Sequence, residues 1–590
     1  MIWNICFILS LALLLSAAIW AIKTSGTYKS NRIFTPFHII FAGVFLAVFT
    51  GLTPVQFHLL AGEAGFLLKF FIFNILQTIQ VFTLDAGTDL ILEHISGAAT
   101  PLNGAYSVYM SVLFFIAPVF TFGFVISLFK NLIETLNYTL HYFDDVYAFS
   151  EISEKSLLLA ESIRANNKDA LLVFTNVDRE EGNILSEHIE SAKQLRAILL
   201  KKNIVAANLT RHSSKSQMYL FAIGEKENEN LIESLKLLDK YRTRKNTHLY
   251  TFSSGTEGEL LLAGAARGEV RLRRVNEVRS LIYRFLYDEG DRLFSSATET
   301  KNGQKNIHIV ITGLGQYGTE ILKAVTWFSQ MDGYSLTVDV FDRDELAGEK
   351  FAALCPELME QHPGETEYDI RIHSGVDVRT KAFAHMLAEL DRISFVFVCL
   401  GDDEININQA ANLRMLCERL GHKPVIKTIV YNTEENNALH NIVNYRGQAY
   451  GIEPMGDLST SCSQELLLGS DLERLALERH LKWGEEEAFW QYEYNYRSSM
   501  ASAIHMKAKI ACNIPGADQK EADLTLAQRD NLERLEHRRW NAYMRSEGYV
   551  YSGSLVKSSR NDLGKMHHDL VDFDSLTEEE KRKDSSVASL

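Results

Sequence analysis

The stretch Ile307–Asp344 reads IHIVITGLGQYGTEILKAVTWFSQMDGYSLTVDVFDRD. An apolar, β-branched run leads into three glycines, Gly313, Gly315 and Gly318. A helical pattern follows, and a second apolar run ends at Asp342. Glycines spaced G-x-G-x-x-G are a weak signal alone. Their position between a predicted strand and a predicted helix, with an acidic residue at the end of the next strand, is typical of a dinucleotide-binding turn.

Each of these residues has a distinct expected role. Gly313 makes the tight turn, Gly315 lets the backbone approach a pyrophosphate, and Gly318 lets helix and strand pack closely. The helix N-terminus offers free N–H groups to an anion, and Asp342 is placed to bond a ribose hydroxyl. The predicted ligand is NAD or another adenine nucleotide. The alternative is a Rossmann-like unit that keeps its glycines for packing and binds nothing.

The composition describes a protein that is part membrane-embedded and part soluble. Its 590 residues, 46% hydrophobic and 23% charged, leave room for several domains. A formal net charge of −15 argues against a nucleic-acid binder, which would show a basic stripe. The six cysteines are scattered without a C-x-x-C pair, which argues against a disulfide framework or a zinc ribbon and suits a reducing compartment.

Three N-terminal segments, 2–22, 33–60 and 107–129, are apolar and long enough to cross a bilayer. A further apolar stretch, 65–84, is interrupted by polar residues, and Asn74, Gln77 and Thr78 within it share one helix face. It fits either a fourth span or an interfacial helix. The polar face fits either a water-filled path or contacts with headgroups and neighbouring helices.

The distribution of charge favours three spans. Lys23, Lys29 and Arg32 follow the first span and Lys130 follows the last, while 63–94 is mainly acidic. Three spans place both basic loops inside and the acidic stretch outside. We therefore expect a multi-pass protein of the cell (inner) membrane, with its large C-terminal part in the cytosol.

The predicted fold class is multi-domain. An α-helical membrane region is followed by two α/β Rossmann-like units with parallel sheets and by a mainly α-helical domain. The predicted parts are a transmembrane region, 1–130; a linker helix, 131–168; a degenerate first α/β unit, 169–290; a second α/β unit, 305–457; and a C-terminal domain, 475–590. The first α/β unit has predicted strands at 170–177, 204–209, 217–224 and 247–254, and no glycine fingerprint.

Acidic residues follow the apolar strand 394–400 of the second α/β unit. Ligands bind at the carboxyl edge of parallel sheets, so Asp402 is a candidate contact for a sugar or a cation. Acids at this position are equally typical of a helix N-cap. The predicted nucleotide site comprises Gly313, Gly315, Gln316, Tyr317, Gly318, Asp342, Arg343 and Asp402.

The glycine fingerprint, Asp342 and the G-D-D-E-I-N-I sequence that begins at Gly401 resemble the TrkA-N (RCK-type) domains, which regulate potassium channels and transporters. The resemblance covers about 307–457, and the first α/β unit would be a degenerate partner half. It implies a fold that binds NAD(H), ATP or related nucleotides, works as a ring or dimer, and transmits strain to a membrane pore.

The C-terminal part is similar to the RyR (ryanodine receptor repeat) domain. The similarity rests on LEHRRWNAYMRSEGYVY (535–551) and KMHHDLVDFDSLTEEEKRKD (565–584), although His568 stands where the family has proline. Upstream, YNYRSSMASAIHMKAKI resembles the opening helix of that domain. The resemblance implies a ligand site comprising Arg497, Ser498, His537, Trp540, Tyr549 and Lys565.

Within that site, Arg497 and Lys565 would pair phosphates, and Trp540 or Tyr549 would stack a base. Trp540 and His537 also fit an ordinary core, because they recur at helical spacing. Arg497 stands out because an Arg near the predicted pocket needs an anionic partner. We expect neither a catalytic residue nor a metal ligand, because we find no metal cluster and no Tyr-x-x-x-Lys pair after the fingerprint.

Together these resemblances imply a non-enzymatic, ligand-gated membrane protein, a homo-oligomeric channel or membrane-permeabilising effector. It would sense a nucleotide or nucleotide-derived small molecule, in the setting of bacterial antiviral or stress defence. One alternative is the regulatory nucleotide-binding subunit of a potassium or other ion transport system. A second is a membrane-anchored NAD(P)-dependent oxidoreductase.

Overall fold

The chain folds into two compact units. The computed structural model describes residues 2–25, 36–63, 65–85, 87–177, 183–300, 303–360, 362, 365–442 and 444–589. The N-terminal unit comprises Met1–Tyr142, Asn176–Glu190 and Ile198–Lys201, and the main unit comprises Phe143–Thr175, Ser191–Ala197 and Lys202–Leu590.

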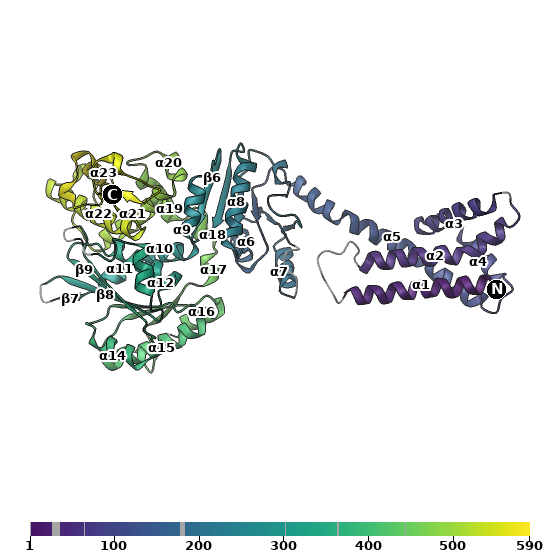
Figure 1. Cartoon of the computed structure of the whole chain (residues 1–590), viewed down its shortest axis with the longest axis horizontal. Helices are drawn as coiled ribbons and strands as arrows, with labels where there is room; N and C mark the ends of the chain where they lie inside the picture. The colour runs from purple at the N-terminus through teal and green to yellow at the C-terminus, as the bar shows by residue number, and fades with distance from the viewer. Residues whose placement is uncertain are drawn as a thin grey trace. The chain divides into compact units, whose positions relative to one another are not determined.

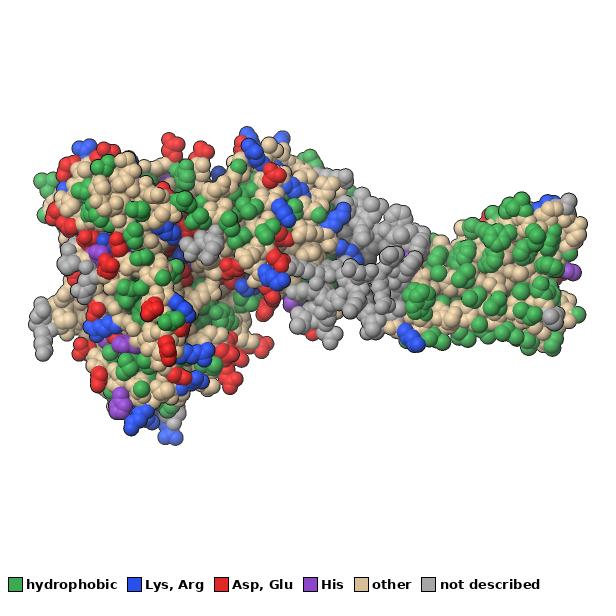
Figure 2. Space-filling model, viewed as in Figure 1, with side chains coloured by type: hydrophobic (Ala, Val, Ile, Leu, Met, Phe, Trp, Pro, Cys, Tyr) green, Lys and Arg blue, Asp and Glu red, His purple; other side chains and the backbone are tan. Residues whose placement is uncertain are grey.

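Long apolar helices build the N-terminal unit: α1 (Ile2–Ser25), α2 (Pro36–Leu60), α3 (Phe66–Thr83), α4 (Thr88–Ser96) and α5 (Asn103–Leu140) (Figure 1). All but α4 contain a segment long and apolar enough to cross a membrane, by length and composition. Large apolar side chains such as Leu67 (78% exposed) and Phe115 (77% exposed) point outward, and Figure 2 shows hydrophobic side chains covering most of the visible face of these helices. Such a surface suits surrounding hydrocarbon rather than water.

Helix α3 is the stretch that the sequence left open between a span and an interfacial helix. It is one of the four candidate spans. Asn74 and Thr78 on its polar face are fully buried, and the Asn74 amide donates to the carbonyl oxygen of Phe49 in α2 at 3.0 Å. These two residues thus contact a neighbouring helix, which was one of the alternatives. Whether three or four helices cross the membrane stays a prediction.

The linker helix predicted for 131–168 is wrong beyond its first residues. Helix α5 ends at Leu140, and strand β1 (Val146–Phe149) and helix α6 (Glu154–Asn166) follow. All four residues of β1 are buried between parallel strands β2 and β4. Apolar residues at helical spacing suggested a helix, but burial on both faces of a sheet favours the extended form for this Val-Tyr-Ala-Phe run. The first α/β unit therefore begins at Val146.

The first sheet is parallel, with strands in the order β2-β1-β4-β5-β6 in the main unit. The strands are β1, β2 (Leu171–Phe174), β4 (Met218–Ala222), β5 (Thr247–Phe252) and β6 (Val270–Val275), and the helices between them include α6, α8 (Glu227–Tyr241) and α9 (Thr256–Ala263). Strands predicted at 217–224 and 247–254 are confirmed as β4 and β5. Strand β6, with alternating arginines, was not predicted.

The segment between β2 and β4 differs from its prediction. Helix α7 is Asn183–Gln194, strand β3 is Ile198–Leu199, and the strand predicted at 204–209 does not form. The reason is local turn chemistry at Asn203, whose side-chain oxygen accepts from the backbone N–H of Val205 at 2.8 Å. This Asx turn holds the chain in a bend where a strand would need extended backbone.

The second sheet has the order β10-β9-β8-β11-β12-β15, with β7 pairing antiparallel to β8. Its parallel strands are β8 (Lys305–Thr312), β9 (Tyr334–Asp342), β10 (Tyr368–Ser374), β11 (Phe395–Val398), β12 (Val425–Ile429) and β15 (Ile452–Met455), and β7 is Thr298–Glu299. This is the 3-2-1-4-5-6 order of a Rossmann-like doubly wound sheet. In the first sheet, the five strands of the main unit follow the same order, 2-1-4-5-6.

Helices cover both faces of the second sheet. They are α10 (Glu277–Glu289), α11 (Asp291–Ser295), α12 (Gln316–Phe328), α13 (Ala347–Leu354), α14 (Lys381–Glu389), α15 (Asp403–Leu420) and α16 (Thr433–His440), and a hairpin of β13 (Asn444–Tyr445) and β14 (Gln448–Ala449) precedes β15. Figure 1 shows α14 and α15 on one face and α10 to α12 on the other. The amphipathic helix predicted at 275–288 is α10.

The C-terminal region is mainly helical, as expected. It consists of α17 (Leu458–Ser461), α18 (Gln464–Leu467), α19 (Asp471–His480), α20 (Glu486–Gln491), α21 (Glu493–Ala511), α22 (Leu526–Ser546), the parallel strand pair β16 (Val550–Tyr551) and β17 (Met566–His567), and α23 (Glu578–Ala588).

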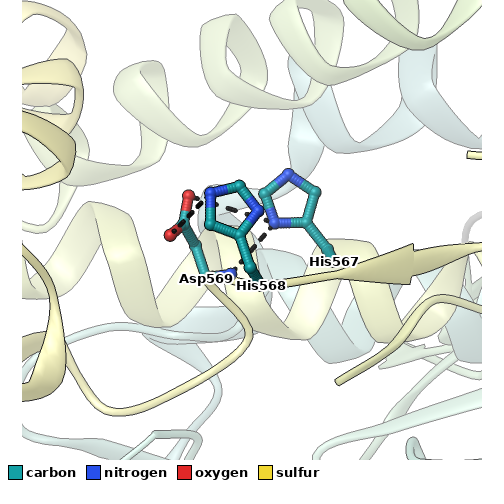
Figure 3. Close-up of side chains that lie close together, drawn as sticks. All are labelled: His567, His568 and Asp569. Atoms are coloured by element: carbon teal, nitrogen blue, oxygen red, sulfur yellow. Dashed lines mark hydrogen bonds and ion pairs between the residues drawn. The ribbon is translucent and has the colours of Figure 1, made fainter. Parts of the chain in front are cut away.

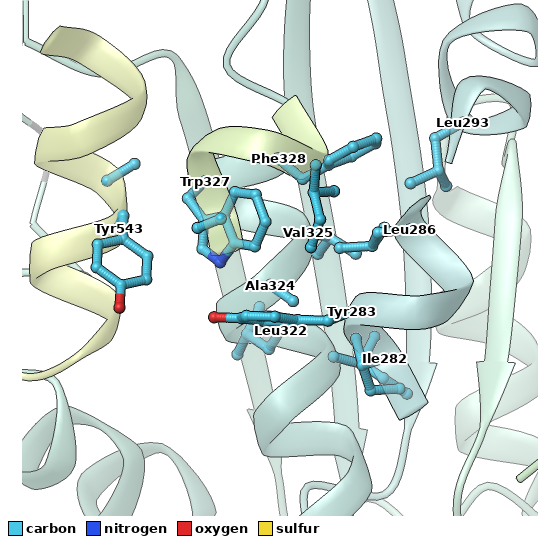
Figure 4. Close-up of a cluster of buried hydrophobic side chains, with 14 of the residues drawn as sticks. Ile282, Tyr283, Leu286, Leu293, Leu322, Ala324, Val325, Trp327, Phe328 and Tyr543 are labelled. Atoms are coloured by element: carbon cyan, nitrogen blue, oxygen red, sulfur yellow. The ribbon is translucent and has the colours of Figure 1, made fainter. Parts of the chain in front are cut away.

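One hydrophobic core joins the second sheet to the C-terminal region. Figure 4 shows Trp327 of α12 between Tyr283 of α10 and Tyr543 of α22. The ring centroids are 5.6 Å from Tyr283 to Trp327 and 6.2 Å from Trp327 to Tyr543, both edge-on. Trp327 is 1% exposed. Because α12 carries the glycine turn at its start, this core fixes that turn against two other parts of the chain.

Candidate functional site

Two glycines of the turn between β8 and α12 are required by packing. Gly313 has φ +92°, and a Cβ built on it would lie 2.4 Å from the carbonyl oxygen of Cys399. A Cβ on Gly318 would lie 1.9 Å from the carbonyl oxygen of Gly313. Any side chain at either position would push strand, loop and helix apart.

Gly315 is different, because packing does not require a glycine there. Its φ is −70°, and among the described residues no heavy atom lies within 4 Å of a Cβ built on it. It borders a space of about 560 Å³, here called the glycine-loop cavity, at the carboxyl ends of β8, β9, β11 and β12. The cavity is lined by residues that include Gly313, Gly315, Gln316, Tyr317, Asp342, Arg343, Arg379, Gly401 and Tyr431.

Asp342 lies in the wall of this cavity, but its carboxylate also holds the glycine turn. One oxygen accepts from the backbone N–H of Leu314 at 2.5 Å, and the other accepts from that of Asp344 at 2.8 Å. A carboxylate offers about four acceptor positions. Asp342 therefore keeps acceptors for a ribose hydroxyl while it fixes the loop.

Two arginines give the cavity an anion-binding side. Arg343, which the sequence predicted, lines the cavity together with Arg379, which it did not. Arg379 lies 2.6 Å from Asp377, and the hydrogen bonds from its guanidinium and backbone N–H lower the pKa of Asp377 to about 2. Arg379 follows β10 at the same sheet edge, so attention to the residues after every strand would have found it.

Asp402 serves as a helix cap. Its carboxylate accepts from the backbone N–H of Ile405 at 3.0 Å at the start of α15. The neighbouring Gly401, with φ +88°, lines the cavity instead. Of the two interpretations that the sequence left open for Asp402, the geometry favours the N-cap.

The first turn of α12 also faces the first sheet. Tyr317 packs edge-on against Tyr431, with ring centroids 5.4 Å apart. Both rings border a second space of about 180 Å³ at the carboxyl ends of β4, β5 and β6. There the carboxylate of Glu227 accepts from the backbone N–H groups of Ser254 and Gly255 before α9, at 3.0 and 3.3 Å. An internal carboxylate thus takes the place that a phosphate would need, as expected of a degenerate unit.

A separate space of about 280 Å³, the C-terminal cavity, lies within the C-terminal helices. Three residues of the RyR-like prediction line it, Ser498, His537 and Trp540. His537 Nε2 lies 2.9 Å from the carbonyl oxygen of Val571, and Trp540 Nε1 donates to the Tyr494 hydroxyl at 3.3 Å. His537 and Trp540 are thus held by hydrogen bonds within the protein, and both also line the cavity.

Basic side chains that the sequence analysis did not select surround the same cavity. They are Arg479, Arg539, Lys557, Arg560 and Lys583. Aromatic rings of Trp483 and Tyr494 lie beside them in the lining. They come from four segments of the sequence, around positions 479, 539, 557–560 and 583, so no local pattern marks them as a set. Rings with nearby cations suit a base and its phosphates.

Arg497 lies away from the C-terminal cavity. Its guanidinium is 2.8 Å from Glu547 and 2.7 Å from Glu259, and its side chain is 9% exposed. Burial alone would lower the pKa of Arg497, but the Glu547 and Glu259 carboxylates outweigh it and raise the pKa. The anionic partners expected for Arg497 are thus internal: Glu493 also lies 3.4 Å from its guanidinium, and Glu259 belongs to α9 of the first α/β unit.

Lys565 and Tyr549 also lie outside the C-terminal cavity. Lys565 Nζ donates to the backbone carbonyl of Glu547 at 2.8 Å and stands 5.9 Å from the Tyr549 ring centroid. With Arg497 it borders a third space of about 250 Å³ that also contains Gln316. Of the six predicted ligand residues, three therefore line the C-terminal cavity and three do not.

Comparison of the chain with protein-family models gave no match, and neither did comparison with curated proteins.

Proposed function

We propose that this chain is a ligand-gated membrane protein, a channel or membrane-permeabilising effector, whose main unit binds a nucleotide or a nucleotide-derived signal. The observation that carries the proposal is the glycine-loop cavity, which is bordered by a glycine, Gly315, that packing does not require. The N-terminal helices, which expose apolar side chains over most of their length, supply the membrane part. The protein acts by binding rather than by catalysis.

The chemistry of the glycine-loop cavity favours NAD or another adenine nucleotide. The first turn of α12 presents backbone N–H groups and a positive helix end to a pyrophosphate. Asp342 supplies ribose acceptors, and Arg343 and Arg379 supply cations at the rim. The resemblance of 307–457 to TrkA-N domains points to the same ligand class.

The C-terminal cavity is the second ligand site in this proposal. Its aromatic rings and five basic side chains suit a nucleotide-derived messenger, which is also the expectation from the RyR-like motifs. The glycine-loop nucleotide then stabilises the assembly, and the messenger drives the response, in bacterial antiviral or stress defence. The main unit lies in the cytosol, and homo-oligomers form the working state at the inner membrane.

A buried contact offers a path between the two cavities. Arg279 of α10 pairs with Glu320 of α12 at 2.8 Å and with Glu547, the C-cap residue of α22, at 3.3 Å. A ligand that moves α12 or α22 changes the geometry of this shared network. Such a ligand shifts the equilibrium between two conformational states of the assembly only to the extent that it binds one state more tightly than the other.

Binding tests the nucleotide site directly. We would measure equilibrium binding of NAD⁺, NADH, ATP and cyclic dinucleotides to the purified full chain in detergent, and to the variants Gly315→Asp and Gly315→Asn. The two variants have the same size and differ in charge. We expect Asp to abolish binding of the nucleotide that the wild type holds and Asn to weaken it less. Unchanged binding in Gly315→Asp would rule out this cavity.

Flux measurements test the membrane function. The chain alone, reconstituted into liposomes, is expected to release ions when the bound messenger class is added, and Gly315→Asp is expected to release fewer. Binding without flux, restored only by a second membrane protein, would instead favour the regulatory subunit of an ion transport system. Consumption of NADH by the purified chain would favour the oxidoreductase.

A further inference from the structure

Three consecutive residues at the end of β17 direct their polar atoms to one point. His567, His568 and Asp569 each offer one ligand atom, and these atoms all lie within 4.8 Å of one another. Figure 3 shows both imidazole rings and the carboxylate gathered at the end of the strand. All three residues line the C-terminal cavity. We expected no metal ligand from the sequence, because no metal-binding cluster is evident in it.

His568 is a buried histidine whose imidazole makes no hydrogen bond within the described part of the chain. It is 3% exposed, and neither ring nitrogen has a hydrogen-bond partner among the described residues. Its Nε2 lies 3.3 Å from Oδ1 of Asp569, close enough for an ion pair but without hydrogen-bond geometry. A buried imidazole normally finds partners for its nitrogens, because burying them bare costs free energy. A metal ion would supply that partner.

A fourth candidate ligand comes from helix α23. Glu580 lines the same cavity, and its carboxylate is in hydrogen-bonding contact with that of Asp569. Two facing carboxylates repel unless a proton or a cation lies between them. Of the cations that line the cavity, Lys583 forms an ion pair with Glu580, and Arg560 pairs with Asp562 at 2.8 Å.

We propose that His567, His568 and Asp569, with Glu580 as the fourth ligand, bind a divalent transition-metal ion of the zinc type. Imidazole nitrogens with carboxylate oxygens suit zinc and its neighbours, whereas calcium and magnesium prefer oxygen alone. Ligand atoms around tetrahedral zinc lie about 3.4 Å apart, from bonds of about 2.1 Å. The ligand atoms of His567, His568 and Asp569 lie within 4.8 Å of one another, so binding an ion requires them to draw closer together.

His567 exchanges one interaction for another when the ion binds. Its Nδ1 accepts from the backbone N–H of Asp569 at 3.2 Å, so this nitrogen is unprotonated and its lone pair points toward the chain turn. The ion takes that lone pair. Glu580 belongs to α23, and the other three ligands lie at the end of β17. The ion therefore joins α23 to residues at the end of β17 that line the C-terminal cavity. Metal binding thereby orders a wall of that cavity, whether or not the cavity takes a messenger.

Metal titration of the full chain tests this site. We would strip the purified protein with chelator, add Zn²⁺ in competition with a zinc-binding dye, and compare the wild type with His568→Ala and with His385→Ala, a control at an exposed histidine on α14. We expect one tightly held Zn²⁺ in the wild type and the control, and at least tenfold weaker binding in His568→Ala. Equal affinity in all three proteins would overturn the proposal.

Two further measurements guard against misfolding of the variant. Zn²⁺ is expected to raise the melting temperature of the wild type but not of His568→Ala, whose metal-free melting temperature should match that of the metal-free wild type. Co²⁺ added to the wild type should give the visible absorption of a four-coordinate nitrogen and oxygen site. A six-coordinate spectrum, or no shift in the wild-type melting temperature, would argue against the site without relying on any variant.

Discussion

Arg279 and Glu320 form a buried ion pair, with 2.8 Å between the arginine Nε and a glutamate oxygen, that joins α10 to the helix carrying the glycine turn. The same guanidinium reaches Glu547, the C-cap residue of α22, at 3.3 Å. Helix α10 follows the first sheet, α12 belongs to the second, and α22 belongs to the C-terminal region. The Arg279 side chain thus joins three parts of the chain, and its removal should destabilise all three.

Arg279→Ala should strongly destabilise the main unit. It leaves Glu320 and part of the Glu547 charge buried without a partner, which typically costs about 3–5 kcal/mol of unfolding free energy. Denaturant unfolding of the full chain in detergent measures the loss. Arg284→Ala, at a partly exposed pair with Asp288 on the same helix, should cost less than about 1 kcal/mol. A double variant, Arg279→Met with Glu320→Leu, should recover much of the loss.

The glycines of the turn should separate into two kinds. Gly318→Ala places a Cβ 1.9 Å from a backbone oxygen, so we expect it to destabilise the chain by about 1–3 kcal/mol or more. Gly315→Ala meets no atom within 4 Å and should leave the melting temperature unchanged while weakening nucleotide binding. Equal melting temperatures for the two variants would contradict the packing difference between Gly318 and Gly315.

A buried histidine–aspartate–histidine cluster in the second sheet should make the free energy of unfolding depend on pH in the acidic range. Asp339 is fully buried, 2.8 Å from His308 Nε2 and 2.7 Å from His373 Nε2. Burial would raise the pKa of Asp339, but these two partners outweigh it and lower the pKa to about 2. Because the folded pKa lies below the ordinary value of 3.8, the stabilisation is present above about pH 4 and is lost as the pH falls toward 2.

Asp339→Asn tests this cluster. At pH 7 we expect a loss of about 1.5–3 kcal/mol, the usual range for hydrogen bonds to a charged group. The difference from the wild type should shrink as the pH is lowered below 4, since the wild-type carboxyl then becomes neutral as well. Asp369→Asn, at a partly exposed pair with Arg371, serves as the control and should show little effect at any pH. A difference that stays constant down to pH 2 would contradict this assignment.

Ser498→Phe should distinguish the two ligand sites. The new ring fills part of the C-terminal cavity, which measures about 280 Å³, so binding of the messenger should weaken by more than about tenfold. Binding of a nucleotide at the glycine turn should stay at its wild-type value, because Ser498 does not line that cavity. Ser498→Thr, which keeps the hydroxyl, is the matched control. Loss of both ligands in Ser498→Phe would indicate a single shared site.

The sequence was sufficient where the signal is local. Gly313, Gly318 and the strands before and after them were predictable, because a tight turn and a close helix–strand approach leave no residue but glycine. The apolar N-terminal helices and the alternation of strands with helices were equally readable. Asp402 was predicted as an ambiguous residue, and a helix cap was one of the two roles considered.

Long-range contacts settled the remaining features. Strand β1 was hidden because its four residues look helical in context, and burial between β2 and β4 extends them. Arg497 was expected to bind a ligand, but Glu259 and Glu547, 238 and 50 residues away, already neutralise it. Glu580 of α23 reaches the carboxylate of Asp569, a contact that no local pattern in the sequence marks. Local conformation follows from side-chain sterics and periodicity, whereas the partner of a buried charge depends on which distant segment packs against it.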